Sequence, residues 1–576
     1  KFSAAYAQPA PTSARAHSRR FRSARRLCGL RSRLMRFMGG RGKSAPTLES
    51  TYGDSPPVFF TESSAMPERR NHFAVIWAVC FGLMAFSVFA QPGGLDRSFG
   101  AGLGETAIDF GSNDRSESMV LQADGKIVIA GTCGGTIYGL ICVARLLESG
   151  ELDTSFGVGG KFIASDADGA YGVSYVRQVS VGVDSLQRIV IASECGGLLC
   201  VRRLTSQGQI DTTFGLNGLS RPLPFVSLGT TSALQIAIAS TGKILVVSHC
   251  LNACSIRLLP NGALDLAFGS SGVQDSSLDF WPQALTLLPG DEYLVSGFCQ
   301  NFLPSRLVQT HCTAKFFSNG SVDTSFGVAG IAKANTETEG LAFANSRATT
   351  GDFFVGGGCG TPLDNRWNLC VLKFGSTGQI SSAFGVQGVA SAGIEGEAHS
   401  VAIDSRGRIL AAGTCALNNL EQRCLARFTN VGALDVQFGD GGYVRLPKSA
   451  YRDWFSNVRL DALGKIVLGG TYATSGWDFS VVRMHSVQNF FDLDYDNESK
   501  PDTDAILYLR HLLGFHDTAL TSGALGTYAD RTSAADIATY LSTPNSTYPN
   551  CSASIVGAPG GPQAMLDGIV LLRAMM

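Results

Sequence analysis

Cysteines are the first residues whose types and spacing could do chemistry, because twelve of the fifteen recur as six pairs. The first cysteine of each pair ends a strand-like segment, and the second stands three residues before a Lys or Arg, while 3 to 12 residues separate the two. Metal thiolates usually keep a tight mutual spacing, so the pattern favours disulfides between facing antiparallel strands. Metal thiolates and free buried thiols remain the alternatives. The predicted disulfides are Cys133–Cys142, Cys195–Cys200, Cys250–Cys254, Cys299–Cys312, Cys359–Cys370 and Cys415–Cys424.

A seventh copy of the same segment lacks both cysteines together and has Tyr472 and Ser480 at the equivalent positions. Residues that are lost as a pair are expected to be bonded as a pair. Oxidised cysteines are typical of exported proteins, so the pairing also predicts export.

A basic residue and an acidic residue recur with the cysteines. One interpretation is a ring of cations that binds an anion at a common axis. The other is a structural ion pair or turn cap in each unit, since Asp readily bonds nearby backbone amides. We favour the structural role, because a catalytic group is needed once and not seven times. The basic residues are Arg145, Arg203, Arg257, Lys315, Lys373, Arg427 and Arg483, and the acidic residues are Asp96, Asp153, Asp211, Asp265, Asp323 and Asp435.

Carboxylates alternate near the end of the chain, at Asp492, Asp494 and Asp496. An EF-hand loop offers oxygen ligands to calcium from its first, third and fifth positions, and Asp504 stands one place after the expected final ligand. We therefore predict at most one calcium ion, held by Asp492, Asp494, Asp496 and Asp504. The alternative is a small helical cap whose acids face solvent.

Histidines form no cluster along the sequence, and only His311 and His399 are expected near the funnel of a repeat fold. The chain has no Gly-x-Ser-x-Gly elbow and no HExxH helix. We therefore predict a protein without catalytic residues. An active site built from the loops of separate repeats remains the alternative.

These residues belong to a repeat marked by a Leu-Asp-x-Ser-Phe-Gly turn at residues 95–100, and the turns follow at steps of 54 to 58 residues. Each unit contains about four strand-like segments, which predicts an all-β fold: a seven-bladed β-propeller of four-stranded blades. A strand near residues 103–110 is expected to complete the last blade and close the ring. An open solenoid is the alternative. The turns centre on Phe99, Phe156, Phe214, Phe268, Phe326, Phe384 and Phe438.

The turn, together with the Asp-Gly-Lys-Ile-Val-x-Ala-Gly strand at residues 124–131, resembles the bacterial delta-60 repeat over about residues 95–485. The copy at residues 380–385 departs from the motif because it lacks the Asp. The resemblance implies a secreted, propeller-like protein and no particular activity. Two loop–helix halves, at residues 491–510 and 567–573, resemble a degenerate dockerin, which implies a cohesin-like partner.

Charge and hydropathy divide the chain into four predicted parts. Residues 1–65 are a basic extension that is disordered or not native, residues 66–90 a signal peptide, residues 91–488 the seven-repeat β-propeller, and residues 489–576 the dockerin-like helical module. The chain from residue 91 carries 32 Lys and Arg against 43 Asp and Glu, which argues against nucleic acid as a partner. The protein is thus expected to be secreted or periplasmic, and membrane-bound only if the signal segment stays uncleaved.

The predicted function is extracellular binding or structural adhesion without catalysis. The loops at Asn301–His311 and Thr361–Asn368 would contact a protein or a glycan. An enzyme acting on a polysaccharide or a lactone, and calcium-dependent surface attachment through the C-terminal module, are the alternatives.

Overall fold

The computed structural model describes the repeats and part of the C-terminal module. The predicted extension and signal peptide lie outside the described residues. The described residues are 92–111, 113–134, 139–164, 178–195, 198–221, 234–249, 253–276, 278, 280–303, 306–334, 339–360, 367–417, 420–446, 453–473, 476–486, 493, 502–526, 529 and 532–542.

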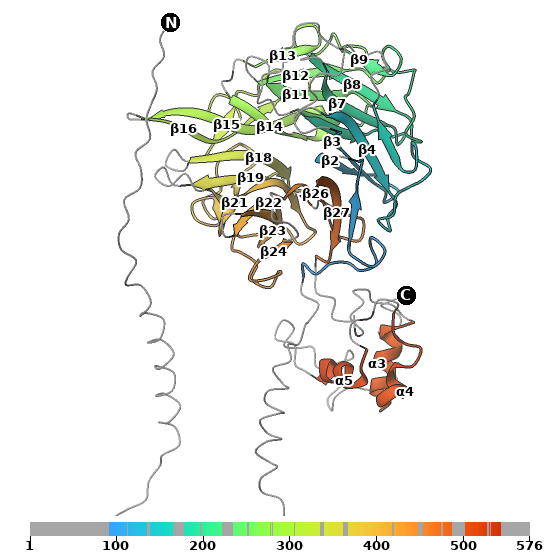
Figure 1. Ribbon diagram of the computed structural model, residues 1–576. Helices are drawn as coiled ribbons and strands as arrows, with labels where there is room; N and C mark the ends of the chain where they lie inside the picture. Colours follow the sequence, from blue (N-terminus) through green and yellow to red (C-terminus); the bar gives the residue numbers. More distant parts are fainter. Residues whose placement is uncertain are drawn as a thin grey trace, which may run out of the picture. The chain divides into compact units, whose positions relative to one another are not determined.

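The repeats fold into antiparallel sheets that follow one another around a common centre (Figure 1). The first sheet contains β2 (Arg115–Leu121), β3 (Ile127–Cys133), β4 (Leu140–Leu146) and β5 (Lys161–Ile163). The second contains β6 (Val179–Val183), β7 (Ile189–Cys195), β8 (Leu198–Leu204) and β9 (Leu219–Ser220). The third contains β10 (Gln235–Ile238), β11 (Ile244–His249), β12 (Ala253–Leu258) and β13 (Val273–Asp275). The fourth contains β14 (Phe280–Leu287), β15 (Tyr293–Leu303), β16 (Arg306–Phe316) and β17 (Ile331–Lys333), with the 3-10 turn η2 (Pro289–Asp291) between β14 and β15.

The fifth and sixth repeats share one seven-stranded sheet, so the prediction of seven separate four-stranded blades is wrong. The described residues form five four-stranded sheets and this larger one. The physical reason is β21, a continuous strand of 15 residues whose first half pairs with β20 and whose second half pairs with β22. The sheet contains β18 (Glu339–Arg347), β19 (Phe353–Gly360), β20 (Asn368–Phe374), β21 (Val389–Ile403), β22 (Ile409–Leu417), β23 (Leu420–Phe428) and β24 (Tyr443–Leu446).

The two ends of the repeat region meet in the last sheet, as the sequence predicted. Its strand order is β1 (Glu105–Ile108), β27 (Trp477–Met484), β26 (Ile466–Ala473) and β25 (Trp454–Leu460). Glu105 faces Val482 and Ile108 faces Phe479 in this pairing. The ring is therefore closed by hydrogen bonds between the two ends of the repeat region, which excludes the open solenoid.

The core lies between neighbouring sheets. Val128 and Val143 of the first sheet pack in one buried cluster with Val181 and Ile191 of the second. The turn phenylalanine Phe156 is fully buried in the same cluster. The repeated Phe is thus a wedge between blades, which explains its recurrence.

Disulfides clamp the central hairpins, as the sequence predicted. Cys200 and Cys254 are also disulfide-bonded. Their predicted partners, the Cys195 side chain and Cys250, lie outside the described residues. The four pairs described in full are Cys133–Cys142, Cys299–Cys312, Cys359–Cys370 and Cys415–Cys424.

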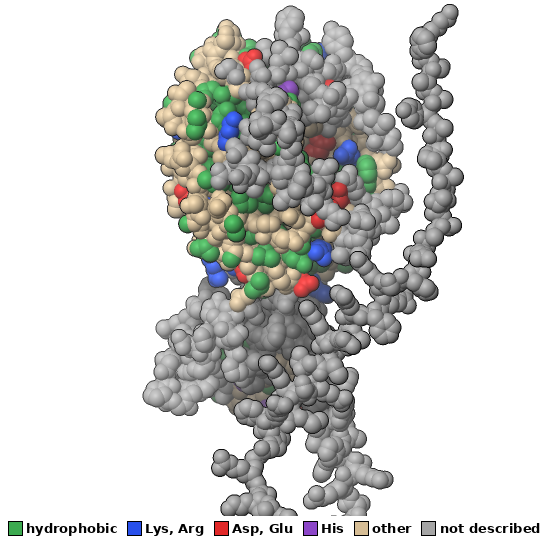
Figure 2. Space-filling view, turned by 90° about the vertical axis from the view of Figure 1, so that its left-hand side faces the viewer, with side chains coloured by type: hydrophobic (Ala, Val, Ile, Leu, Met, Phe, Trp, Pro, Cys, Tyr) green, Lys and Arg blue, Asp and Glu red, His purple; other side chains and the backbone are tan. Residues whose placement is uncertain are grey.

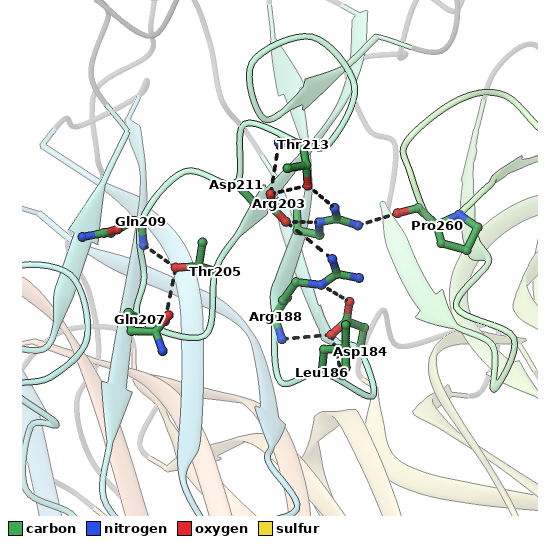
Figure 3. A network of polar contacts seen from close by, with 10 residues as sticks. All are labelled: Asp184, Leu186, Arg188, Arg203, Thr205, Gln207, Gln209, Asp211, Thr213 and Pro260. Atoms are coloured by element: carbon green, nitrogen blue, oxygen red, sulfur yellow. Dashed lines mark hydrogen bonds and ion pairs between the residues drawn. The ribbon is translucent and has the colours of Figure 1, made fainter.

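In five repeats the repeated Arg forms an ion pair with the turn Asp and also reaches the next sheet. Lys315 pairs with Asp323 in the fourth repeat, whereas Lys373, whose turn has no Asp, pairs with Asp352. Arg203 Nε donates to Asp211 Oδ2 at 2.7 Å, and its Nη1 donates to the carbonyl of Pro260 in the following repeat (Figure 3). The guanidinium lies 4.6 Å above the ring of Phe214. The same three contacts recur around Arg145, Arg257, Arg427 and Arg483. These cations are neutralised inside the scaffold, so the structural interpretation holds.

The described part of the C-terminal module contains three short helices around a small core of its own. They are α3 (Asp504–Leu512), α4 (Asp517–Thr521) and α5 (Ala534–Ser542). Leu507, Leu520 and Ile537 are buried together. Among the described residues, no helix is both long and apolar enough to cross a membrane.

Candidate functional site

A pocket of about 460 Å³ lies where the first strands of the repeats converge. We call it the axial pocket. It is lined by Arg115, Ser116, Glu117, Gln178, Val179, Leu234, Gln235, Gln283, Phe343, Glu397, His399, Thr414, Glu421, Trp454 and Ser456. In six repeats, lining residues lie in the first strand of the repeat or directly before it. These strands are β2, β6, β10, β14, β18 and β25, and in the sixth repeat β21 takes the place of the first strand. The pocket is therefore assembled from every repeat.

Five β-bulges aim one side chain from each of five repeats into the axial pocket. In β2 the pairing with β3 skips one residue between Ser116 and Ser118, which leaves Glu117 unpaired. A bulge re-aims a side chain in this way, because two residues on one strand oppose one on the other. The same shift occurs in β14, β18, β21 and β25. The five bulged residues are Glu117, Gln283, Phe343, His399 and Ser456, and all five line the pocket.

A glycine on the neighbouring strand makes each bulge possible. A Cβ on Gly131 would lie 1.9 Å from the carbonyl oxygen of Arg115, which precedes the bulge. A Cβ on Gly357 would lie 1.7 Å from the oxygen of Leu341 in the same way. The described pairs of β6 with β7 and of β10 with β11 contain no register shift, and there Ser193 and Ser248 occupy the glycine position. The repeated Gly therefore leaves room for the backbone of the first strand to bulge and turn a side chain into the pocket.

Glu117 is held in the pocket wall by two neighbouring repeats. The amide of Val179 in the second repeat donates to Glu117 Oε2, and Asn457 Nδ2 in the seventh donates to the Glu117 carbonyl at 3.1 Å. Burial raises the pKa of Glu117 to about 8, although the Val179 amide and the charge of Arg115 act in the opposite direction. The carboxyl group therefore keeps its proton at neutral pH and can donate a hydrogen bond.

His399 faces the pocket from β21. Its Nδ1 lies 3.2 Å from the carbonyl oxygen of Phe455, and since a carbonyl only accepts, this contact places a proton on Nδ1. Nε2 points to Glu397 Oε2 at 3.6 Å. The ring also meets Phe343 edge to face, with the centroids 5.6 Å apart. The imidazole is thus oriented by three repeats at once.

Aromatic and cationic groups line another part of the wall. The Arg115 guanidinium lies 5.3 Å from the ring of Trp454 and 5.5 Å from the ring of Trp477. The two indoles meet edge to face at 5.9 Å. Such a cation–π arrangement fixes the Trp454 indole, which lines the pocket, in one orientation.

The predicted site residues have mixed outcomes. His399 lines the axial pocket, as expected, but His311 does not: it is buried between the fourth and fifth repeats, where burial lowers its pKa to about 4. The segment Asn301–His311, predicted as a binding loop, continues the hairpin of β15 and β16. Most of Thr361–Asn368 lies outside the described residues.

The predicted calcium ligands are only partly described. Asp492, Asp494 and Asp496 lie outside the described residues. Asp504 begins α3 and is buried, and it accepts hydrogen bonds from the Leu493 amide at 2.5 Å and the Thr503 hydroxyl at 2.9 Å. The calcium site therefore stays a prediction.

Sequence reasoning missed Glu117, Gln283, Phe343 and Ser456. An alignment of the repeats contained the signal, since each stands in the first strand of its copy and differs from the others. The neighbouring scaffold positions keep the same residue types from copy to copy, whereas the residue at the bulged position differs in each copy.

The fold is that of a β-propeller, and the comparisons with known proteins agree with this class. Residues 122–156 match the family described as "Domain of unknown function (DUF5122) beta-propeller". No curated protein matches the chain.

Solved structures with a similar arrangement are distant in sequence. Virginiamycin B lyase from Staphylococcus aureus is 9% identical, with 66% of this chain and 98% of that chain covered and a TM-score of 0.37. The polysaccharide lyase Uly1 is 8% identical, with 64% and 90% covered and a TM-score of 0.37. Drosophila Semaphorin 2a is 7% identical, with 69% and 76% covered and a TM-score of 0.41.

Proposed function

We propose that this protein binds a neutral, hydroxyl-rich ligand, an oligosaccharide, in the axial pocket. The observation that carries the proposal is the convergence of five chemically different bulged side chains on one pocket. A structural repeat needs the same residue in each copy, whereas a ligand site needs different ones. The delta-60 and dockerin-like assignments, and secretion through residues 66–90, belong to the same proposal.

The chemistry of the wall favours a neutral polar ligand. Side chains of Gln178, Gln235 and Gln283 supply both donors and acceptors. Trp454 supplies an apolar face of the kind that stacks on a sugar ring. Arg115 is the one Lys or Arg among the described lining residues, and Glu397 and Glu421 oppose it, so an anionic ligand would be disfavoured.

A glycan array with the full-length, oxidised protein tests the proposal. Trp454→Ala removes the aromatic wall, and Glu151→Gln changes an exposed acid elsewhere on the first repeat as a control. We expect a set of neutral glycans bound by the wild-type protein and the control and lost in Trp454→Ala. A wild-type protein that binds no glycan, or a Trp454→Ala variant that binds as well as the control, would refute the proposal.

Catalysis on a polysaccharide or lactone is a second candidate, favoured by one observation. Glu117, which carries a proton at neutral pH, and His399 line one pocket, and such a pair can act as acid and base. This arrangement removes the sequence-based reason for predicting no enzyme, which was the lack of a cluster of acids and histidines. Catalysis would be supported if the wild-type protein converts a glycan identified on the array and the Glu117→Gln variant still binds that glycan but no longer converts it. Bound glycan that stays intact over hours would support binding alone.

A further inference from the structure

Three carboxylates meet at the seam where the ring closes. Asp109 follows β1, Asp114 precedes β2, and Asp478 lies in β27. One ligand oxygen from each lies within 4.8 Å of the others. The backbone fixes these segments to one another, because the Asp114 amide donates to the carbonyl of Trp477 at 2.6 Å and the Trp477 amide donates to Asn113 Oδ1 at 3.2 Å. The cluster therefore joins chain segments that are more than three hundred residues apart.

Asp114 gives the cluster an unsatisfied acceptor. The residue is fully buried, and its Oδ2 accepts the Phe110 amide at 2.6 Å, but its Oδ1 accepts no hydrogen bond. Burial raises the pKa of Asp114 to about 6, and the charges of Asp109 and Asp478 add to the increase, while the amides of Phe110 and nearby Gly134 offset part of it. A buried acceptor beside two further carboxylates is costly unless a cation joins them.

The equivalent aspartate of the seventh repeat, Asp453, also precedes the first strand of its repeat, and its Oδ1 accepts the Ala473 amide at 2.9 Å. Gly134 stands at the position of Ala473 in the first repeat and its amide likewise acts on Asp114, so the distinguishing feature of Asp114 is the two further carboxylates beside it. Among the described residues, no Lys or Arg pairs with the carboxylate of Asp109 or Asp114. Lys161, a nearby cation, donates to the backbone carbonyl of Asp109 and lies 5.1 Å from the ring of Phe110.

We propose that Asp109, Asp114 and Asp478 bind a calcium ion that ties β1 and the start of β2 to β27. Calcium takes oxygen ligands at about 2.3–2.6 Å, so two oxygens on one ion lie at most about 5 Å apart, which the cluster satisfies. An all-oxygen set selects a hard cation over a transition metal. Asp109 is exposed, so water can reach the ion and complete its coordination. The ion would neutralise the charge repulsion and stabilise ring closure.

Thermal unfolding of the full-length protein, with CaCl₂ or with EDTA, tests this site. The double variant Asp109→Asn/Asp478→Asn removes two ligands and keeps the size of each side chain. The control Asp275→Asn/Asp440→Asn removes two exposed acids elsewhere. A third variant, Asp492→Asn/Asp494→Asn, disables the predicted C-terminal calcium loop, so that the two sites can be separated. Trp477, next to Asp478, gives a local fluorescence signal.

We expect calcium to raise the Tm of the main transition by about 3 °C or more in the wild type, the control and the C-terminal variant. The ligand double variant should lose this shift and the calcium-dependent change in fluorescence. Without calcium it should be more stable than the wild type, because like charges are removed. Equal calcium shifts in the double variant and the wild type, or no shift in the wild type at millimolar calcium, would overturn the proposal.

Discussion

Arg423 Nη1 donates to Glu105 Oε1 at 2.7 Å, which joins the sixth repeat to the N-terminal strand that completes the seventh. The same Nη1 contacts the Ser480 hydroxyl at 2.8 Å, and the guanidinium lies 5.3 Å from the ring of Tyr472. Ser480 and Tyr472 occupy the positions of the missing seventh cysteine pair. A buried ion pair between β23 and β1 therefore lies beside the hairpin that lacks the cysteine pair.

Arg423→Met should destabilise the protein strongly. Arg423 is fully buried and Glu105 nearly so, and removal of the guanidinium takes the opposite charge of Arg423 away from a buried carboxylate, which costs about 3–5 kcal/mol. Chemical denaturation would measure the loss. Arg347→Met, at an exposed arginine, is the control and should change stability by less than about 0.5 kcal/mol. Equal effects from the two substitutions would contradict the role of the pair.

The turn aspartates should make the propeller sensitive to acid. Burial alone would raise the pKa of Asp96, but the Ser98 hydroxyl and the charges of Arg483, Lys465 and His485 lower it to about 2. A carboxylate whose folded pKa is lowered stabilises the protein above its unfolded pKa of 3.8, and this contribution is lost as the pH falls towards 2.

Asp96→Asn removes that contribution. The variant should be less stable than the wild type at pH 7, and its stability should fall less steeply between about pH 4 and 2. Asp153, whose pKa is also lowered to about 2, offers an independent repeat of the experiment. Parallel pH–stability curves for the variant and the wild type would show that ionisation of Asp96 contributes nothing to the pH dependence of stability.

Glu117→Gln should have the opposite effect on the pH profile. Because burial raises the folded pKa from 4.5 to about 8, the unfolded chain ionises first and stability decreases as the pH rises between these values. Gln removes the ionisation, so the variant should be more stable than the wild type at pH 7 and its stability should be flatter from about pH 4.5 to 8. If the stability of the variant falls with pH as steeply as that of the wild type, the decrease comes from groups other than Glu117.

Gly413→Ala should disrupt the bulge that carries His399. The new Cβ would lie 2.0 Å from the carbonyl oxygen of Glu397, so the strand must shift, at a cost of about 1–3 kcal/mol. Gly375→Ala is the control, since its nearest neighbour would be 3.8 Å away. Denaturation curves and glycan binding should both change in the first variant alone. An unchanged Gly413→Ala protein would show that the wall adapts without loss.

The repeat period, the hairpin disulfides and the closing strand could be predicted from the sequence because each depends on local patterns. The turn Phe and its Arg–Asp pair recur since every blade has the same neighbours. Two features could not be predicted. The continuity of β21 depends on which partners its two halves find, and the axial pocket depends on bulges created by contacts across strands, as between Gly131 and Arg115.

The bulged residues give the most direct test of the central claim that the axial pocket binds the ligand. Calorimetric titration of a glycan from the array would be done with Glu117→Gln, Gln283→Ala, Phe343→Ala, His399→Gln and Ser456→Ala, with Glu151→Gln as the control. We predict that most of the five weaken binding at least about fivefold, which corresponds to about 1 kcal/mol, and that the control stays within about twofold. Unchanged affinity in all five variants would contradict the claim.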